Sequence, residues 1–142
     1  MKEGPVESDI VLRPIGVIRT PFKEFGEVPR QPMKGIQGTL EVFDEYKAGL
    51  KGLEGRSHMV LLFHLHLQKK HLLEVVPYGG LRITGVFSTR APMRPNHIGL
   101  SVVRLKKIEG NILTIEDIDM IDGSPLIDIK PHMVIDPDEQ GG

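Results

Sequence analysis

The fold is decided by the stretch Gly85-Val-Phe-Ser-Thr-Arg-Ala-Pro-Met-Arg-Pro-Asn-His-Ile-Gly-Leu-Ser-Val-Val-Arg-Leu105. Its two ends are rich in β-branched, aromatic and aliphatic residues, which predicts two buried strands. Between them, Pro92 and Pro95 restrict the backbone on both sides of Arg94, so we expect a stiff connecting loop. A stiff polar loop held between buried strands is one way in which a fold preorganises a site. We therefore expect the functional site around this loop.

The composition of the chain is that of a globular protein. Of its 142 residues, 26% are charged and 39% are hydrophobic, which predicts one domain over residues 1–142 with loose tails at 1–10 and 136–142. The absence of cysteine excludes disulfides and thiolate-bound metals, and with no signal peptide it favours a cytoplasmic protein. No apolar run is long enough for a transmembrane helix. The net charge of −1 means that any RNA contact must come from a local basic patch.

Apolar residues recur with a period of two in several short segments, which predicts strands. The clearest is 58–67, where Met59, Leu61 and Phe63 share one face. Further strands are expected at 11–18, 38–43, 81–88, 100–105, 111–120 and 126–130. A short helix is expected over 45–53 with Asp44 as its N-cap, a hairpin turn at 110–111, and a β-bulge near 116–117. These elements predict an all-β fold, a β-barrel with one or two short helices.

Two histidines, His64 and His66, fall on one face of the expected strand 58–67. Imidazoles at positions i and i+2 of a strand can be presented together to a metal ion. No acidic partner lies at a matching short spacing, so we expect no bound metal. A metal-dependent barrel enzyme that uses these two histidines stays open as an alternative.

Several motifs resemble one family in the same order along the chain. They are Ile15-Gly-Val-Ile-Arg-Thr-Pro-Phe22, Pro29-Arg-Gln-Pro32, the strand from Ser57-His58 to His66, the 87–101 part of the central stretch, and Asp122-Gly-Ser-Pro-Leu-Ile-Asp-Ile-Lys-Pro131. Together they are similar to the TrmO (YaeB-like) family of tRNA methyltransferases. This chain has His97 and His132 where members of that family usually have Pro and Tyr. It also ends before the C-terminal extension of longer bacterial members, which leaves the choice of tRNA open.

The resemblance implies a single-sheeted β-barrel that binds S-adenosylmethionine without a Rossmann fold and forms a homodimer. It further implies methylation of the exocyclic amine of the adenosine 3′ of the anticodon in a tRNA, on a base that already carries a threonylcarbamoyl group. By matching position, it assigns the methyl donor to Pro29, Arg30, Gln31, His66, Arg90, Leu100, Asp122, Gly123, Ser124 and Pro125.

The side chains named by the resemblance suit the chemistry of such a donor. A guanidinium, from Arg30 or Arg90, can bind its carboxylate through two hydrogen bonds. Because glycine permits close backbone approach, the amides of 122–124 could meet the adenine edge. Candidate catalytic groups are Asp128 and Asn96, and Asp128, Asp119 or water could accept the proton that leaves the amine.

The local basic residues beside the motif loop are the expected contacts to tRNA: Arg94, His97, Lys69 and Lys70. A non-catalytic barrel that binds S-adenosylmethionine or RNA is the remaining alternative. Turnover of a labelled donor on tRNA separates that alternative from an enzyme.

Overall fold

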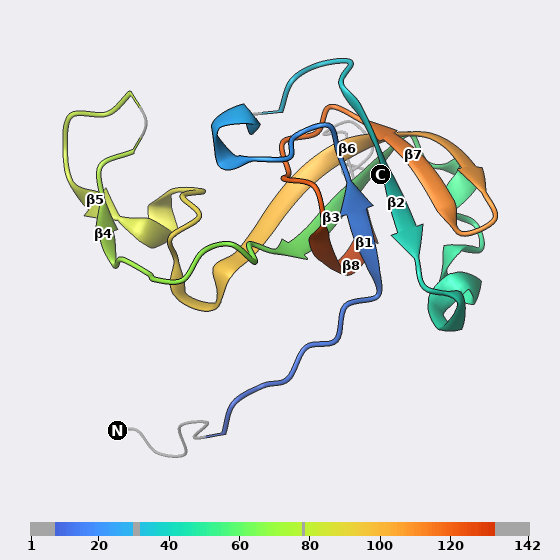
Figure 1. Ribbon diagram of the computed structural model, residues 1–142, viewed down its shortest axis with the longest axis horizontal. Helices are drawn as coiled ribbons and strands as arrows, with labels where there is room; N and C mark the ends of the chain where they lie inside the picture. Colours follow the sequence, from blue (N-terminus) through green and yellow to red (C-terminus); the bar gives the residue numbers. More distant parts are fainter. Residues whose placement is uncertain (1–7, 30–31, 78, 133–142) are drawn as a thin grey trace, which may run out of the picture.

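The computed structural model describes residues 8–29, 32–77 and 79–132, which form a β-barrel with a small hairpin standing beside it (Figure 1). The barrel strands are β1 (Gly16–Arg19), β2 (Gln37–Val42), β3 (His58–His64), β6 (Ile98–Glu109), β7 (Ile112–Glu116) and β8 (Ser124–Pro131). The small hairpin pairs β4 (Glu74–Val75) with β5 (Thr84–Gly85). Five short 3-10 helices complete the described elements: η1 (Phe25–Glu27), η2 (Asp44–Leu50), η3 (Leu53–Gly55), η4 (Val86–Ser88) and η5 (Pro95–His97).

The six barrel strands close in the order β1-β2-β7-β6-β3-β8, and every neighbouring pair is antiparallel. Consecutive connections therefore alternate between the two ends of the barrel. One end carries the connections at 20–36, 65–97 and 117–123. The other end carries the connection at 43–57 and the tight turn at 110–111. We call them the motif end and the helix end.

The barrel interior is filled by alternate residues of the strands, as the period of two predicts. In β3, Met59, Leu61 and Phe63 are buried and their neighbours along the strand are half-buried. The largest fully buried side chains include Ile18, Leu40, Leu113, Ile115 and Leu126, drawn from β1, β2, β7 and β8. The predicted all-β barrel is confirmed.

Close packing between neighbouring strands requires glycine at positions of the barrel wall such as Gly16 and Gly99. A Cβ on Gly16 would lie 2.3 Å from the carbonyl oxygen of Glu41, where β1 runs against β2. A Cβ on Gly99 would lie 2.5 Å from the ring of Phe63, where β6 runs against β3. Neither neighbour is the free end of a flexible side chain, so a larger residue must displace the strand or the core ring.

Several local expectations need correction. Asp44 is the first residue of η2 and not its N-cap, because Phe43 holds that position and makes no side-chain cap. The strand expected at 81–88 is reduced to the two residues of β5, and Phe87 is 75% exposed, because the hairpin has no barrel strand beside it to cover its face. Strand 11–18 begins only at Gly16, and Val11 is exposed.

The β-bulge expected near 116–117 is a turn at Asp117 in the structure, and the irregularities of the sheet lie elsewhere. Strand β7 ends at Glu116, and Asp117 turns the chain with a left-handed φ of 67°. This turn lets Ile118 and Met120 return to the core, which is the change of face that the sequence pattern shows. The register shifts in the ladders lie elsewhere, between Leu105 and Lys107 of β6 and beside the step from Leu62 to Phe63 of β3. The hairpin turn at 110–111 is confirmed, with Gly110 at a φ of 64°.

Candidate active site

The motif loop, residues 86–98, runs from η4 through η5 to the first residue of β6 at the motif end and is stiffened by hydrogen bonds within itself. Thr89 Oγ1 donates to the carbonyl of Val86 at 2.8 Å and accepts from the amide of Ala91 at 3.1 Å. The guanidinium of Arg94 reaches back along the loop, and its Nη1 donates to the carbonyls of Thr89 (2.8 Å) and Ala91 (3.2 Å). Arg94 is thus half-buried and helps to hold the loop that it belongs to.

A second set of bonds ties the motif loop to the chain that follows β3. The amide of Leu65 donates to the carbonyl of His97 at 2.8 Å, and the amide of Leu72 donates to the carbonyl of Met93 at 3.0 Å. The imidazole Nε2 of His97 lies 2.8 Å from the carbonyl of Lys70. The expected tRNA contacts Lys69, Lys70, Arg94 and His97 therefore come from two segments held side by side, and their role in RNA binding stays a prediction.

The backbone at the end of the motif loop takes an unusual shape. Asn96 and His97 both have positive φ, of 67° and 51°. Proline fixes φ near −65°, so a proline at 97 could not adopt this conformation. The histidine at 97 therefore fits a backbone conformation that a proline would not.

The imidazoles near the end of β3 lie close enough to influence one another. Burial lowers the pKa of His64 first, and the positive charges of His66, His97 and Lys69 lower that pKa further. His66 is not on the face of a strand with His64, because β3 ends at His64 and the chain turns there. Among the described residues, no group of three or more His, Asp or Glu side chains is placed to hold a metal ion.

Two side chains of this end are left with unused polar groups. Nδ1 of His66 is buried and has no hydrogen-bond partner within the described part of the chain. The guanidinium of Arg90 is exposed and forms no hydrogen bond or ion pair with the described residues. A buried unpaired nitrogen and a free cation at one end of a barrel are what a polar ligand with an anionic group needs.

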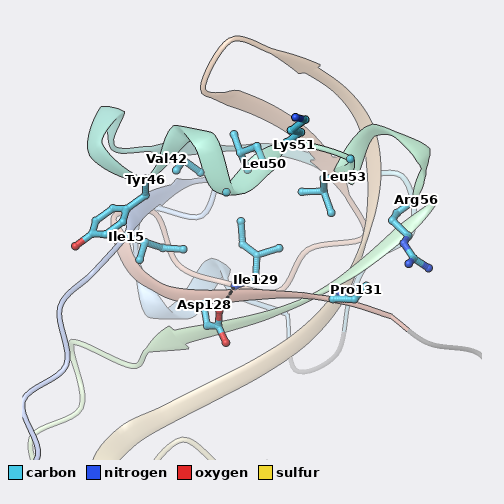
Figure 2. A pocket seen from close by; sticks show the side chains of 12 residues that line it. Ile15, Val42, Tyr46, Leu50, Lys51, Leu53, Arg56, Asp128, Ile129 and Pro131 are labelled. Carbon is cyan, nitrogen blue, oxygen red and sulfur yellow. Dashed lines mark hydrogen bonds between the residues drawn. The ribbon is translucent and has the colours of Figure 1, made fainter.

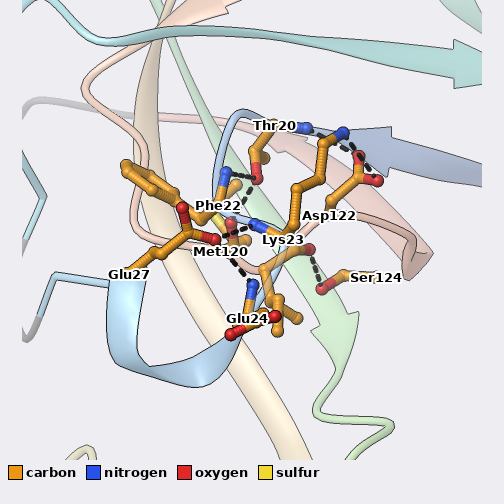
Figure 3. Close-up of polar contacts among 9 residues, drawn as sticks. Thr20, Phe22, Lys23, Glu24, Glu27, Met120, Asp122 and Ser124 are labelled. Atoms are coloured by element: carbon orange, nitrogen blue, oxygen red, sulfur yellow. Dashed lines mark hydrogen bonds and ion pairs between the residues drawn. The ribbon is translucent and has the colours of Figure 1, made fainter.

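The turn that begins β8 is tied into the barrel (Figure 3). The amides of Asp122, Gly123 and Ser124 donate to the carbonyls of Phe22 (2.8 Å), Ile18 (2.8 Å) and Ile121 (3.3 Å). These three N–H groups are therefore engaged within the fold in this conformation, and their contact with an adenine edge stays a prediction. The bond from Gly123 to Ile18 holds the turn against β1.

The carboxylate of Asp122 strengthens that closure. It accepts from the amide of Thr20 at 3.0 Å and lies 3.0 Å from Nζ of Lys23 (Figure 3). Burial acts to raise the pKa of Asp122, but the bonds from Lys23 and from the Thr20 amide outweigh it and lower that pKa. This carboxylate is an anchor of the barrel wall.

Asp119 lies in the same connection and has a different environment. It stands between the buried side chains of Ile118 and Met120, and its Oδ1 accepts a hydrogen bond from the hydroxyl of Ser101. Ser101 is itself buried, on the inward face of β6. Burial raises the pKa of Asp119, and this outweighs the hydrogen bond from Ser101 and the charge of Arg90, both of which act to lower it.

The remaining predicted site residues are spread more widely. Pro29 is half-buried on the 20–36 connection at the motif end, whereas Arg30 and Gln31 lie outside the described residues. Leu100 is 42% exposed on the outer face of β6, opposite Leu62 of β3. Pro125 is half-buried at the start of β8.

The two catalytic candidates lie at different ends. Asn96 is exposed in the motif loop, but Asp128 lines a cavity of about 420 Å³ at the helix end, between η2 and β8 (Figure 2). That cavity is mainly apolar, and Asp128 is already paired with Nζ of Lys130 at 2.8 Å. Sequence reasoning gave Asp119 only a minor place, although a lone acidic residue between two core positions was a signal for it.

These features define a class of protein: a small closed antiparallel barrel whose polar site is built from the long connections at one end. The model of the family described as the tRNA-methyltransferase O N-terminal domain matches residues 17–136. The chain belongs to the TrmO family.

Named relatives agree with this membership. The chain is 53% identical over 126 residues to a "probable S-adenosyl-L-methionine-binding protein" of Pyrococcus abyssi, covering 87% of this chain and 68% of that protein. It is 38% identical over 138 residues to the tRNA (adenine(37)-N6)-methyltransferase of Escherichia coli, covering 89% of this chain and 59% of the enzyme. The crystal structure of TrmO from Pseudomonas aeruginosa matches with a TM-score of 0.72 and 39% identity, over 89% of this chain and 57% of that one. The chain thus spans less than two thirds of the last two proteins.

Proposed function

We propose that this chain is an S-adenosylmethionine-dependent methyltransferase that acts on the exocyclic amine of adenosine 37, the residue 3′ of the anticodon, in tRNA. The observation that carries the proposal is that residues from three separate family motifs gather at one end of a barrel of the TrmO family. The name of the Escherichia coli relative supports the substrate, and the name of the Pyrococcus relative supports the methyl donor. We extend the proposal to an adenosine that already carries a threonylcarbamoyl group.

The free polar groups of the motif end fit this donor. S-Adenosylmethionine supplies an activated methyl group on a sulfonium, together with a carboxylate that needs a cation. Arg90 is exposed on the stiff motif loop, so its backbone is already fixed and its guanidinium is available to a carboxylate. His66 offers a buried nitrogen that needs a partner. Because the leaving group is a neutral thioether, correct positioning by these residues supplies most of the rate.

The same end offers a positive surface for tRNA. Lys69, Lys70, Arg94 and His97 surround the motif loop, whereas the whole chain carries a net charge of −1. We propose that these residues bind phosphates locally. Affinity for tRNA should then fall with rising salt, with a slope set by a few neutralised phosphates.

We also propose that the protein acts as a homodimer in the cytoplasm, where a tRNA substrate is found. The outer face of β3 and β6 presents an apolar surface: Leu62 and Leu100 face each other on it, and Ile98 beside them is 39% exposed. Phe87 and Leu73 of the neighbouring hairpin region are 75% and 62% exposed. A second copy can cover this surface, and light scattering at low micromolar concentration should give twice the 15.8 kDa of one chain. No helix among the described residues is long and apolar enough to cross a membrane.

The deciding experiment is mass spectrometry of the nucleosides of a tRNA incubated with the protein and labelled donor. Methylated adenosine should appear in tRNA that carries the threonylcarbamoyl group and should be weak or absent in tRNA that lacks it. Equal methylation of both tRNAs contradicts the requirement for the group. No methylation of either contradicts the enzyme assignment.

The second candidate is a barrel that binds the donor without transferring its methyl group. It is favoured by the name of the Pyrococcus relative, which mentions binding alone. Calorimetry showing donor binding, combined with no turnover on bulk tRNA, would select this candidate.

A further inference from the structure

Asp119 differs from Asp117 and Asp122, the other aspartates of the 117–123 connection, because no cation among the described residues is in contact with it. Asp117 lies 3.8 Å from Arg104 and accepts from the amide of Gly35. Asp122 is bonded to Lys23 and to the amide of Thr20. Within the described residues, the carboxylate of Asp119 has Ser101 as its one side-chain donor, and the charge that acts on it is that of Arg90.

The position of Asp119 is fixed from both sides. Ile118 and Met120 are buried in the core, which anchors the backbone before and after it. Ser101 projects from the barrel wall and donates to Oδ1, and the backbone amide of Asp119 also acts on this carboxylate. A carboxylate held this way is fixed in orientation, and its two oxygens offer more acceptor positions than these bonds use.

We propose that Asp119 is the proton acceptor of the methyl-transfer step and that Ser101 is the positioning residue that fixes its carboxylate. This inference rests on the proposed function. In the step, the lone pair of the amine nitrogen forms the new bond to the methyl carbon. The carbon–sulfur bond breaks with its electron pair to sulfur, which becomes a neutral thioether. The proton on the now cationic nitrogen passes to the carboxylate of Asp119, so atoms and charges balance.

The surroundings of Asp119 suit this role. Burial removes water from the carboxylate and makes it a stronger base than an exposed aspartate. Arg90 is close enough to feel the same charge, so the acceptor and the proposed donor-carboxylate ligand lie at one site. The neighbouring carboxylates are already engaged with Lys23 and Arg104, and Asp128 lies at the other end of the barrel.

The first test compares Asp119→Asn with the wild type in single-turnover methyl transfer at saturating donor. We expect the rate to fall about 10²-fold, the lower end of the range for a positioned base. Donor affinity measured by calorimetry should stay within about twofold. Asp44→Asn is the matched control, because Asp44 is exposed at the helix end, and it should keep the wild-type rate.

The second test uses Ser101→Ala, which leaves Asp119 in place. The hydrogen bond from Ser101 lowers the pKa of Asp119, so its removal should raise that pKa further. The rate is lost when Asp119 is protonated, so the acid limb of the pH–rate profile should move to higher pH in Ser101→Ala. The carboxyl carbon shift of Asp119, followed by NMR in the protein without donor, should move in the same direction.

The results of these tests decide whether Asp119 is the proton acceptor. An Asp119→Asn rate within about threefold of the wild type overturns the inference, and so does a Ser101→Ala profile that keeps the wild-type limb. If Asp119→Asn does not fold, the Ser101→Ala profile and the carboxyl titration decide alone. A wild type that binds donor but transfers no methyl group to any tRNA refutes the proposed function, and the inference falls with it.

Discussion

The two ends of the barrel are built from different kinds of connection. At the helix end, η2 and η3 lie over the strands, the β6–β7 turn is short, and an open cavity of about 420 Å³ is lined by mainly apolar side chains. At the motif end, the connections are long and carry Arg90, three interacting imidazoles and the Asp119–Ser101 pair. The apolar hollow of the helix end and the polar chemistry of the motif end are thus on opposite sides. The difference teaches that polar groups without partners, and not an apolar hollow, mark the site of this fold.

The largest expected effect is on donor binding, which should respond to a substitution at the motif end and not to one at the helix end. Arg90→Lys keeps the charge but loses the planar pair of donors, so donor binding should weaken by roughly 1–3 kcal/mol, and Arg90→Ala should weaken it more. Lys51→Ala, at the cavity of the helix end, is the control and should leave binding unchanged. Calorimetry measures the affinity, and thermal unfolding without donor measures the fold. If Arg90→Ala lowers only the melting temperature, Arg90 holds the loop and the comparison fails.

The next effect concerns stability at the helix end. Gly16→Ala places a Cβ 2.3 Å from the carbonyl oxygen of Glu41, so the free energy of unfolding should fall by about 2 kcal/mol. Gly49→Ala, in η2, has no atom within 4 Å of the new Cβ and should be neutral or slightly stabilising. Urea denaturation measures both variants. Donor affinity of folded Gly16→Ala should equal that of the wild type, and a large loss there would mean that the two ends are coupled.

A smaller effect tests the anchor at the motif end. Asp122→Asn removes the charge that pairs with Lys23 and leaves a weaker, neutral acceptor for the Thr20 amide, and we expect it to cost about 1 kcal/mol of stability at pH 7. Because the pKa of Asp122 is lowered in the fold, its stabilisation is present above the ordinary value of 3.8 and is lost as pH falls through the lowered value. The difference between variant and wild type should therefore shrink in acid. Chemical denaturation at several pH values checks this, and a difference independent of pH would contradict it.

The smallest effect belongs to the imidazoles. The pKa of His64 is lowered by burial and by its positive neighbours, so its contribution to stability is full above 6.5 and is lost as pH falls through the lowered value. His64→Gln should lose less stability than the wild type on acidification, a difference on the order of 1 °C in melting temperature. His71→Gln, exposed in the same connection, serves as the control. Identical acid sensitivity of wild type and His64→Gln would show that the imidazoles do not interact.

The barrel could be predicted from sequence wherever one face of a strand is buried and the other is not. The alternation of Met59, Leu61 and Phe63 shows this for β3, and the turn at Gly110 follows from its neighbours in the chain. The prediction was wrong at Phe87, which is apolar like a core residue but 75% exposed. Burial there depends on whether another strand lies alongside, and local sequence does not contain that information.

The site was harder to predict because its parts depend on contacts between distant segments. The motif loop itself was recognisable from Pro92, Pro95 and the arginines between the strands. The engagement of the amides of Asp122 and Gly123 was not, since their acceptors, the carbonyls of Phe22 and Ile18, are about 100 residues away along the chain. The contact between Ser101 and Asp119 likewise exists because the barrel brings β6 and the β7–β8 connection together.

The long connection between β3 and β6, from Leu65 to His97 and called here the excursion, has its two ends next to each other. His64 pairs with Ile98, and the amide of Leu65 is bonded to the carbonyl of His97, so the whole excursion is the enlarged tip of the β3–β6 hairpin. The entropic cost of closing a loop rises by only about 0.6 kcal/mol for each doubling of its length. A longer tip therefore adds little to the free-energy cost of closing the barrel. The excursion can therefore be shortened, lengthened or exchanged as a cassette without redesigning the barrel. The barrel wall of this chain can thus stay constant while the segment at the tip of the β3–β6 hairpin is replaced.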